Sequence, residues 1–216
     1  MSLIPFKAST SFLISGATRS GKSFLTYKLL KQNSYLFEIP IKKVLYTYKI
    51  WQPLFDVIQK ECNFVTFHQN LPDPETLDAF IHEKGHKMLI CDDLMNEVLN
   101  SPHIENLFTA AVHHLNLSII NIQQNCFQQA KHARTISLNA TVLILFKNYR
   151  DSSQIMCLGK QISPGKSQAF IKMFEDATQR PYGYLLIDCD PSRENKHRFR
   201  TNIFKDEEPV IVYELL

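Results

Sequence analysis

One short stretch near the amino terminus constrains this chain more than any other. Residues Gly16–Ser23 read G-x-x-x-x-G-K-S, and glycines at these positions allow the backbone to turn tightly and to approach an anion closely. An apolar run, Phe12–Ile14, precedes the pattern, and a run of helical character, Ser23–Leu30, follows it. A strand, a glycine-bearing loop and a helix in this order are typical of a phosphate-binding P-loop, because backbone N–H groups and the helix amino terminus then point at the phosphates.

The side chains of this loop predict how a nucleotide would be held. The Lys22 ammonium can reach the β- and γ-phosphates, and the Ser23 hydroxyl can bind Mg²⁺. The alternative that the pattern leaves open is an ordinary turn rich in glycine and serine. The residues expected to bind the cofactor ATP are Gly16, Ala17, Thr18, Arg19, Ser20, Gly21, Lys22, Ser23 and Phe24.

A pair of carboxylates follows a second apolar run. Met88–Cys91 leads into Asp92 and Asp93, which is the Walker B pattern. At the end of a buried strand, Asp92 can hold Mg²⁺ directly or through water, and Asp93 can orient or deprotonate the attacking water. The alternative is that both carboxylates only cap the next helix. Together with a P-loop, the pair predicts a Mg²⁺-dependent ATPase.

A third candidate is an amide at the end of another apolar strand. Ser118–Ile122 leads into Gln123, Gln124 and Asn125. A glutamine at this strand end would lie near the γ-phosphate, where Gln124 could position water or sense the state of the nucleotide. Amides also end strands in ordinary turns, so the spacing alone leaves both interpretations open.

Strand-like and helical segments alternate along the chain, which predicts an α/β fold: a three-layer sandwich with a mainly parallel sheet. In such sheets the ligand binds at the carboxyl ends of the strands. We expect a single domain over residues 1–216, since no linker or repeat divides the chain. The expected strands are Phe12–Ser15, Lys43–Tyr48, Asn63–Phe67, Lys87–Cys91, Leu117–Ile122, Thr141–Phe146, Tyr184–Ile187 and, as a strand or an extended tail, Arg198–Phe204. The expected helices are Ser23 to about Lys31, Gln52–Cys62, Glu75–Glu83, Ile104–His114, Ser152–Lys160 and Lys166–Thr178.

Composition narrows the class of protein without naming an activity. Among 216 residues, 44% are apolar and 21% are charged, and the net charge is +3; this is ordinary for a globular protein and permits nucleic-acid binding without arguing for it. The five cysteines form no C-x-x-C pair, so buried reduced thiols are expected rather than disulfides or zinc ligands. No run approaches the ~20 apolar residues of a spanning helix and no secretion signal is visible, so we expect an intracellular protein without membrane contact.

Basic residues gather in three short sets that could line a DNA-facing channel. Because a ring divides its positive potential among subunits, each subunit would need few such charges. Acidic neighbours fit an ordinary mixed surface equally well. The sets are Lys42–Lys43, Lys131–Arg134 and Arg193–Arg200.

Several of these motifs together resemble the FtsK–HerA superfamily. Within it, the chain is similar to the viral genome-packaging ATPases of poxvirus type, and most of all to those of adintoviruses and Polinton-like elements. The resemblance extends from about Phe12 to Phe204. It rests on Gly16–Ser23, Cys91–Leu94, the strand ending at Gln124, Arg134–Asn139, Leu145–Asp151, Pro181–Leu185 and Arg200–Phe204.

The resemblance implies a RecA-like, additional-strand ATPase that forms a homo-oligomeric ring, a pentamer or hexamer, and drives double-stranded DNA into a capsid. It also implies capsid or portal-vertex proteins as partners, and a location inside the host cell, in nucleus or cytoplasm, or in the virion. Gln124 corresponds to the strand-end glutamine of the family. Two positions depart from the pattern: Asp93 stands where the superfamily often has glutamate, and Gln123 stands where the family has threonine. The role of Asp93 as base and the register of Gln124 therefore stay open.

The resemblance also implies an arginine finger, since ring motors place the active site at a subunit boundary, where a neighbour's arginine stabilises charge on the γ-phosphate. Arg150 follows the expected strand Thr141–Phe146 at its carboxyl end, and the trans-acting arginine of the superfamily lies in a similar loop. Arg134, between two expected strands, is the second candidate. A local pair of Arg150 with Asp151, or helix capping by Arg134, are the structural alternatives.

Two other functions are compatible with a P-loop. A small kinase would pass the γ-phosphoryl group of ATP to a metabolite, but no glycine-rich segment with several arginines resembles a kinase lid. A capsid-associated module would use nucleotide only for assembly. Hydrolysis that is stimulated by duplex DNA without transfer to a small acceptor would distinguish translocation from the kinase. Hydrolysis measured with Lys22→Ala as control would decide against a module that uses nucleotide only for assembly.

Overall fold

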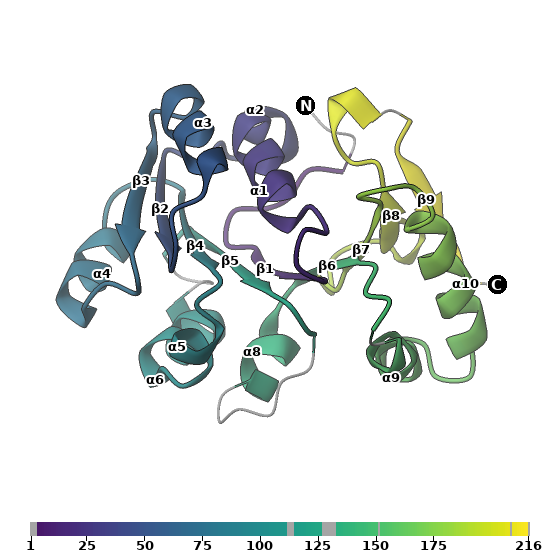
Figure 1. Ribbon diagram of the computed structural model, residues 1–216. Coiled ribbons are helices and arrows are strands. Elements are labelled where there is room, and N and C mark those ends of the chain that lie inside the picture. The colour runs from purple at the N-terminus through teal and green to yellow at the C-terminus, as the bar shows by residue number, and fades with distance from the viewer. Residues whose placement is uncertain (1–3, 112–114, 127–132, 151, 208, 216) are drawn as a thin grey trace.

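A nine-stranded sheet runs through the computed structural model, which describes residues 4–111, 115–126, 133–150, 152–207 and 209–215 (Figure 1). The strand order is β3-β2-β4-β5-β1-β6-β7-β8-β9, and the strands from β3 to β6 in this order are parallel, whereas β7, β8 and β9 are antiparallel to their neighbours. The strands are β1 (Ser11–Ser15), β2 (Lys43–Tyr48), β3 (Val65–Gln69), β4 (Lys87–Asp92), β5 (Leu117–Gln123), β6 (Val142–Phe146), β7 (Tyr184–Asp188), β8 (Phe199–Thr201) and β9 (Ile211–Tyr213).

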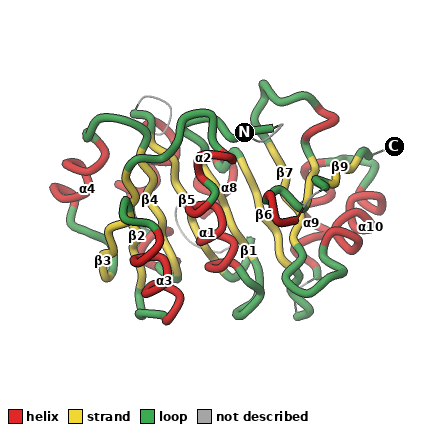
Figure 2. The backbone as a smooth tube through the Cα atoms, turned by 90° about the horizontal axis from the view of Figure 1, so that it is seen from above, coloured by secondary structure: helices red, strands yellow, loops and turns green. Residues whose placement is uncertain are grey.

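The central strands are mostly apolar because helices cover both faces of the sheet. Every residue of β1, β4, β5, β6 and β7 is buried. One face carries α1 (Lys22–Lys31), α2 (Asn33–Leu36) and α3 (Pro53–Glu61) (Figures 1 and 2). The other face carries α4 (Pro74–Ile81), α5 (Met95–Leu99), α6 (Pro102–Asn106), α8 (Ala133–Asn139), α9 (Ser153–Ile162) and α10 (Ser167–Ala177). These three layers confirm the predicted α/β sandwich.

The order of the strands also confirms the additional-strand type of fold. β5 lies between β1, which leads into the P-loop, and β4, which ends at Asp92. In this register Ser15 pairs with Gln123, and Asp92 pairs with Ile122. The P-loop, the carboxylates and the amides therefore leave the sheet from the same edge and at nearly the same level.

Several short elements were absent from the sequence-based prediction. The expected helix Ile104–His114 is α6 followed by a π-helical turn, Leu107–Ala111, and residues 112–114 lie outside the described part of the chain. The helices α2, α5 and α8 span four to seven residues and β9 spans three, which is too short for a hydrophobic period to show. The expected strand or tail Arg198–Phe204 contains only the short β8.

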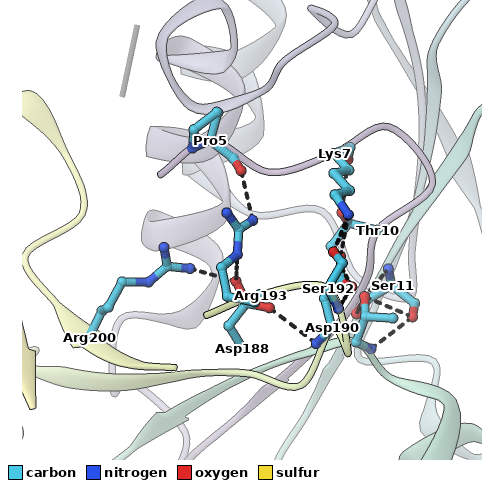
Figure 3. Close-up of polar contacts among 10 residues, drawn as sticks. Pro5, Lys7, Thr10, Ser11, Asp188, Asp190, Ser192, Arg193 and Arg200 are labelled. Carbon is cyan, nitrogen blue, oxygen red and sulfur yellow. Dashed lines mark hydrogen bonds and ion pairs between the residues drawn. The ribbon is translucent and has the colours of Figure 1, made fainter. Parts of the chain in front are cut away.

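Two arginines of one predicted basic set form ion pairs with Asp188 (Figure 3). Asp188 pairs with the first residue of β6 and so lies at the sheet edge opposite the P-loop. Arg200 is 1% exposed, and its Nη2 donates to Asp188 Oδ2 over 2.8 Å. Arg193 donates from Nε to the same oxygen over 2.9 Å and from Nη2 to the Pro5 carbonyl. The expectation that the whole of Arg193–Arg200 could face DNA is therefore wrong for these two arginines, because a buried carboxylate requires them as partners. Of the Lys131–Arg134 set, Lys131 and His132 lie outside the described residues.

Within the described residues, no helix is long and apolar enough to cross a membrane. None of the five cysteines forms a disulfide, and Cys62, Cys91 and Cys126 are buried.

Candidate nucleotide-binding site

A cavity of about 420 Å³ lies at the carboxyl edge of the parallel strands. Its walls come from the P-loop and the start of α1, from the ends of β4 and β5, and from the residue before α3 and the first turn of that helix. It lies where α/β sheets bind their ligands. The lining residues are Thr18, Arg19, Gly21, Lys22, Ser23, Phe24, Gln52, Leu54, Asp92, Asp93, Ile122, Gln123 and Gln124.

The two P-loop glycines are required by space and by backbone conformation. A Cβ atom at Gly16 would lie 2.5 Å from the Phe146 Cβ, so no larger residue fits between the loop and β6. Gly21 has a φ of 104°, in the left-handed region that a side chain disfavours. It lies directly before α1, and its carbonyl accepts from the Leu25 N–H over 2.8 Å. These constraints produce the loop-to-helix junction that the motif predicts.

The Lys22 ammonium occupies the mouth of the loop. Its Nζ donates to the carbonyls of Gly16 and Ala17 over 2.7 and 2.8 Å. Burial lowers the pKa of Lys22 below its usual value, and the nearby carboxylates of Asp92 and Asp93 act in the opposite direction. An anion in the loop would stabilise the charged ammonium, because it would add negative charge where burial now disfavours the cation.

The Asp92 carboxylate lies at the floor of the cavity with two hydroxyl donors. Ser23 Oγ donates to Asp92 Oδ2 over 3.0 Å, and the Tyr46 hydroxyl donates to the same oxygen over 2.7 Å. Tyr46 lies on β2 and is wholly buried. Burial raises the pKa of Asp92, and the hydrogen bonds from Tyr46 and Ser23 lower it. The serine that the motif assigns to the metal and the aspartate at the end of β4 are therefore brought into contact.

This donor set fits Mg²⁺ bound together with a nucleotide. A carboxylate and a hydroxyl are hard oxygen ligands, and Mg²⁺ is usually held by one or two carboxylates, phosphate oxygens and water rather than by a protein cage. The described residues contain no group of three or more His, Cys, Asp or Glu side chains that could hold a metal alone. The buried Ser20 Oγ has no hydrogen-bond partner among the described residues, which leaves a donor available for a phosphate oxygen.

The second carboxylate and the strand-end amides differ from Asp92 in exposure. Asp93 is exposed and has a φ of 56°, a left-handed conformation that turns the chain sharply after β4. Gln123 is the last residue of β5 and is buried, with its Nε2 3.4 Å from the Cys126 carbonyl. Gln124 lies one residue beyond the strand and is exposed. Both glutamines line the cavity. Either of them could therefore correspond to the strand-end glutamine that the family resemblance implies.

Neither candidate arginine finger lines the cavity of its own chain. Arg150 is exposed in the loop after β6, and its backbone N–H donates to Asn148 Oδ1 over 3.1 Å. Arg134 is exposed near the start of α8. Arg19, within the P-loop, is the arginine among the described lining residues. Asp151, the alternative local partner of Arg150, lies outside the described part of the chain.

The sequence analysis missed Tyr46, Gln52, Leu54 and Ile122 as residues of this site. Tyr46 reads as core packing in the sequence, since a tyrosine in an apolar strand has no motif that reveals its partner. Gln52 and Leu54 line the cavity from the segment after β2. Their position follows from the strand order, because β2 lies beside β4 although they are distant in sequence.

The strand order and the P-loop geometry define the fold of a P-loop NTPase. No protein-family model matches the sequence, and no curated protein is similar to it in sequence.

Solved structures give a similarity in fold. The chain is similar to the genome-packaging NTPase B204 from Sulfolobus turreted icosahedral virus 2 in complex with ATPγS, with a TM-score of 0.55 and 15% identity over 97% of this chain and 98% of the other. The same NTPase in complex with AMPPCP gives a TM-score of 0.55 and 14% identity over 97% and 99% of the two chains. At this identity the likeness establishes the shared fold.

Proposed function

We propose that the protein is a Mg²⁺-dependent ATPase that acts as a homo-oligomeric ring, a pentamer or hexamer, and drives double-stranded DNA into a viral capsid. The observation that supports hydrolysis best is that the P-loop, Asp92, Asp93 and Gln124 line one cavity. The likeness in fold to a genome-packaging NTPase supports the link to packaging. The proposal treats the chain as one ATPase domain, with capsid or portal-vertex proteins as further partners, inside the host cell or in the virion.

The P-loop would hold the triphosphate. Lys22 would leave the carbonyls of Gly16 and Ala17 and donate to the β- and γ-phosphates, which accept from an ammonium more strongly than neutral carbonyls do. Ser23 and Asp92 would hold Mg²⁺, which would supply positive charge to offset the charge that develops on the phosphates. Ser20 would donate its free hydroxyl to a phosphate oxygen. The hydrogen bonds of Lys22 to the loop carbonyls and of Ser23 to Asp92 support the roles of these three residues.

Water would be activated on the exposed side of the cavity. The water oxygen attacks the γ-phosphorus, the bond to the β–γ bridging oxygen breaks, and ADP leaves. Asp93 is exposed while Asp92 is buried, so Asp93 is the carboxylate that can accept the proton of this water. Gln124, one residue beyond β5, would orient the same water through its amide.

The arginine finger would come from the neighbouring subunit. Arg150 lies outside its own cavity but at the same edge of the sheet, in the loop after β6. An exposed arginine at this edge can reach a nucleotide held by another copy, and Arg134 is the second candidate. Residues that act across a boundary make hydrolysis depend on assembly.

The test is the rate of ATP hydrolysis with and without random-sequence duplex DNA, measured together with the mass of the protein in solution. We expect duplex to stimulate hydrolysis without regard to sequence, and the stimulation to fall as salt rises, because the contacts are to phosphates. Lys22→Ala is the control: it should remove turnover and leave the melting temperature nearly unchanged. An assembled oligomer that DNA does not stimulate would refute translocation, and phosphoryl transfer to a small acceptor would favour a kinase.

A further inference from the structure

A second hollow begins where the phosphate cavity ends. It has a volume of about 400 Å³ and shares Gly21 and Phe24 with the phosphate cavity. One wall is a single face of α1 with Phe24, Leu25 and Lys28, and the other wall comes from the ends of β6 and β7 and from the segment after β8. We call this hollow the aromatic groove. Its lining residues are Gly21, Phe24, Leu25, Lys28, Phe146, Tyr182, Tyr184, Phe204 and Glu207.

The rim of the groove exposes aromatic side chains that the core does not use. Phe24 is 54% exposed and Tyr182 is 71% exposed. Phe146, Tyr184 and Phe204 are buried beneath them and form an apolar floor. Planar apolar walls over an apolar floor suit a flat ring, since stacking on an aromatic face is favourable for any nucleobase.

The position of Tyr182 is fixed by a strained turn. Its φ of 61° lies in the left-handed region, which is uncommon for a bulky residue. The next residue must be Gly183, because a Cβ there would lie 2.7 Å from the Ala177 carbonyl oxygen, and its N–H donates to the Arg180 carbonyl over 2.9 Å. This turn brings the Tyr182 ring to 3.2 Å from where a Cβ of Gly21 would be. The turn therefore holds the Tyr182 ring beside the P-loop.

Among the described residues, the aromatic groove is lined by one carboxylate, that of Glu207. Glu207 accepts from Lys28 Nζ over 2.7 Å at Oε1 and from the Tyr184 hydroxyl over 2.8 Å at Oε2. A carboxylate oxygen can accept a further donor, and an ionised carboxylate cannot donate. Lys28 is also engaged by Asp206 over 2.8 Å. A ring that enters the groove therefore meets an acceptor at its inner end, which an amino group can satisfy.

We propose that the aromatic groove binds the nucleobase of the nucleotide, with Phe24 and Tyr182 against its faces and Glu207 accepting from an exocyclic amine. The inference rests on the proposed nucleotide site, because the groove continues from Gly21 where the triphosphate would end. It adds a preference for aminopurines over bases that lack the amine. From Gly21 to Lys28 the groove follows α1 for about 10 Å at 1.5 Å per residue, which leaves room for a purine beyond its ribose.

The test compares binding of nucleotide pairs that differ in the amine. ATP is paired with purine riboside triphosphate, and GTP with ITP; each is measured by displacement of a fluorescent ATP analogue in the presence of Mg²⁺. We expect the amine-bearing member of at least one pair to bind about tenfold more tightly, since a charge-assisted hydrogen bond is lost in its analogue. The pair that shows the difference identifies adenine or guanine as the base.

Variants separate the acceptor from the stacking walls. Glu207→Leu should bring the ratio within the discriminating pair to about one, whereas Asp206→Leu, which removes the other carboxylate on Lys28, should keep it. Tyr182→Ala should weaken all four nucleotides by about tenfold or more, and Tyr182→Phe should restore them, because only the ring is needed. Equal binding within both pairs, or an unchanged ratio in Glu207→Leu, overturns the proposal.

The outcome also separates this inference from the function on which it rests. If Lys22→Ala removes binding of all four nucleotides while their affinities in the wild type are equal, the phosphate site stands and the base groove fails. If Lys22→Ala leaves binding intact, the phosphate site itself fails.

Discussion

The hydroxyl of Tyr46 provides a quantitative test of how the metal-binding carboxylate is held. It donates to Asp92 Oδ2 over 2.7 Å from a wholly buried side chain, so water cannot replace it. A hydrogen bond to a charged group contributes about 1.5–3 kcal/mol, and this bond has the length of a charge-assisted one. Tyr46→Phe removes the hydroxyl and preserves the ring that packs on Phe55 and Phe67 at 5.0 and 5.1 Å. We therefore expect the free energy of unfolding to fall by about 1.5–3 kcal/mol at neutral pH.

The same change should be visible in the metal dependence. Loss of an outer partner of a metal ligand usually weakens metal affinity or activity by about 10–100-fold, so half-saturation of nucleotide binding should need that much more Mg²⁺. Binding of nucleotide in the presence of a chelator should change far less, because Tyr46 does not contact the P-loop amides. The assays are chemical denaturation and a Mg²⁺ titration of a fluorescent ATP analogue.

Tyr48→Phe is the matched control. Tyr48 lies two residues along β2, on the same face of the strand, and its ring packs on Trp51 and Phe55. The substitution removes the same atom, whereas the tyrosine hydroxyl that donates to Asp92 belongs to Tyr46. If Tyr46→Phe behaves like Tyr48→Phe in both assays, the hydroxyl does not position the carboxylate and the reasoning is refuted.

Three further results are expected. Asp93→Asn should keep Mg²⁺-ATP binding and slow hydrolysis by about 10²–10⁴-fold, whereas Asp92→Asn should raise the Mg²⁺ requirement; equal loss of nucleotide affinity in both variants would contradict this division. Arg150→Ala should bind ATP and lose about 10³-fold or more in turnover, and mixing it with Lys22→Ala subunits should restore activity; mixed rings that assemble and stay inactive would exclude action in trans. Burial lowers the pKa of His86 below its usual value, so the unfolded chain binds a proton at a pH at which the native state does not. The free energy of unfolding should therefore fall as the pH drops below about 6.5, by at most about 1.4 kcal/mol per pH unit. A melting series in which His86→Gln shows the same dependence on pH would refute His86 as the cause.

The parts of the site that are readable in the sequence belong to continuous motifs. The P-loop is predicted by Gly16, Gly21 and Lys22 because its chemistry depends on their spacing along the chain. In the structure a strand precedes this loop and a helix follows it, as expected. Asp92 ends an apolar strand, as its pattern predicts. The apolar run predicts the strand β5, whereas its place between β1 and β4 fits the additional-strand fold that the family resemblance implies and does not follow from periodicity.

The parts that were missed depend on contacts between distant segments. Tyr46 meets Asp92 because β2 pairs with β4 in a register that sets Tyr48 beside Asp92, and no local pattern encodes that register. The misassigned Arg200 illustrates the same limit: its charge suggests a surface, but its partner Asp188 lies twelve residues away on β7, inside the core. Short helices such as α5 carry too few turns to show a period.

The antiparallel strands also bring residues to the edge of the sheet where the P-loop lies. β7 begins at Tyr184 beside Phe146, the last residue of β6, so the turn before β7 is delivered to the same edge of the sheet as the P-loop. The segment after β8 returns Phe204 and Glu207 to this edge, where they meet Lys28 of α1 at 4.4 Å from its Nζ to the Phe204 ring and 2.7 Å to the Glu207 carboxylate. A nucleotide that spans the phosphate cavity and the aromatic groove would therefore contact both the parallel and the antiparallel parts of the sheet. Its binding should stabilise the chain beyond the P-loop, because it would join segments that only tertiary structure brings together.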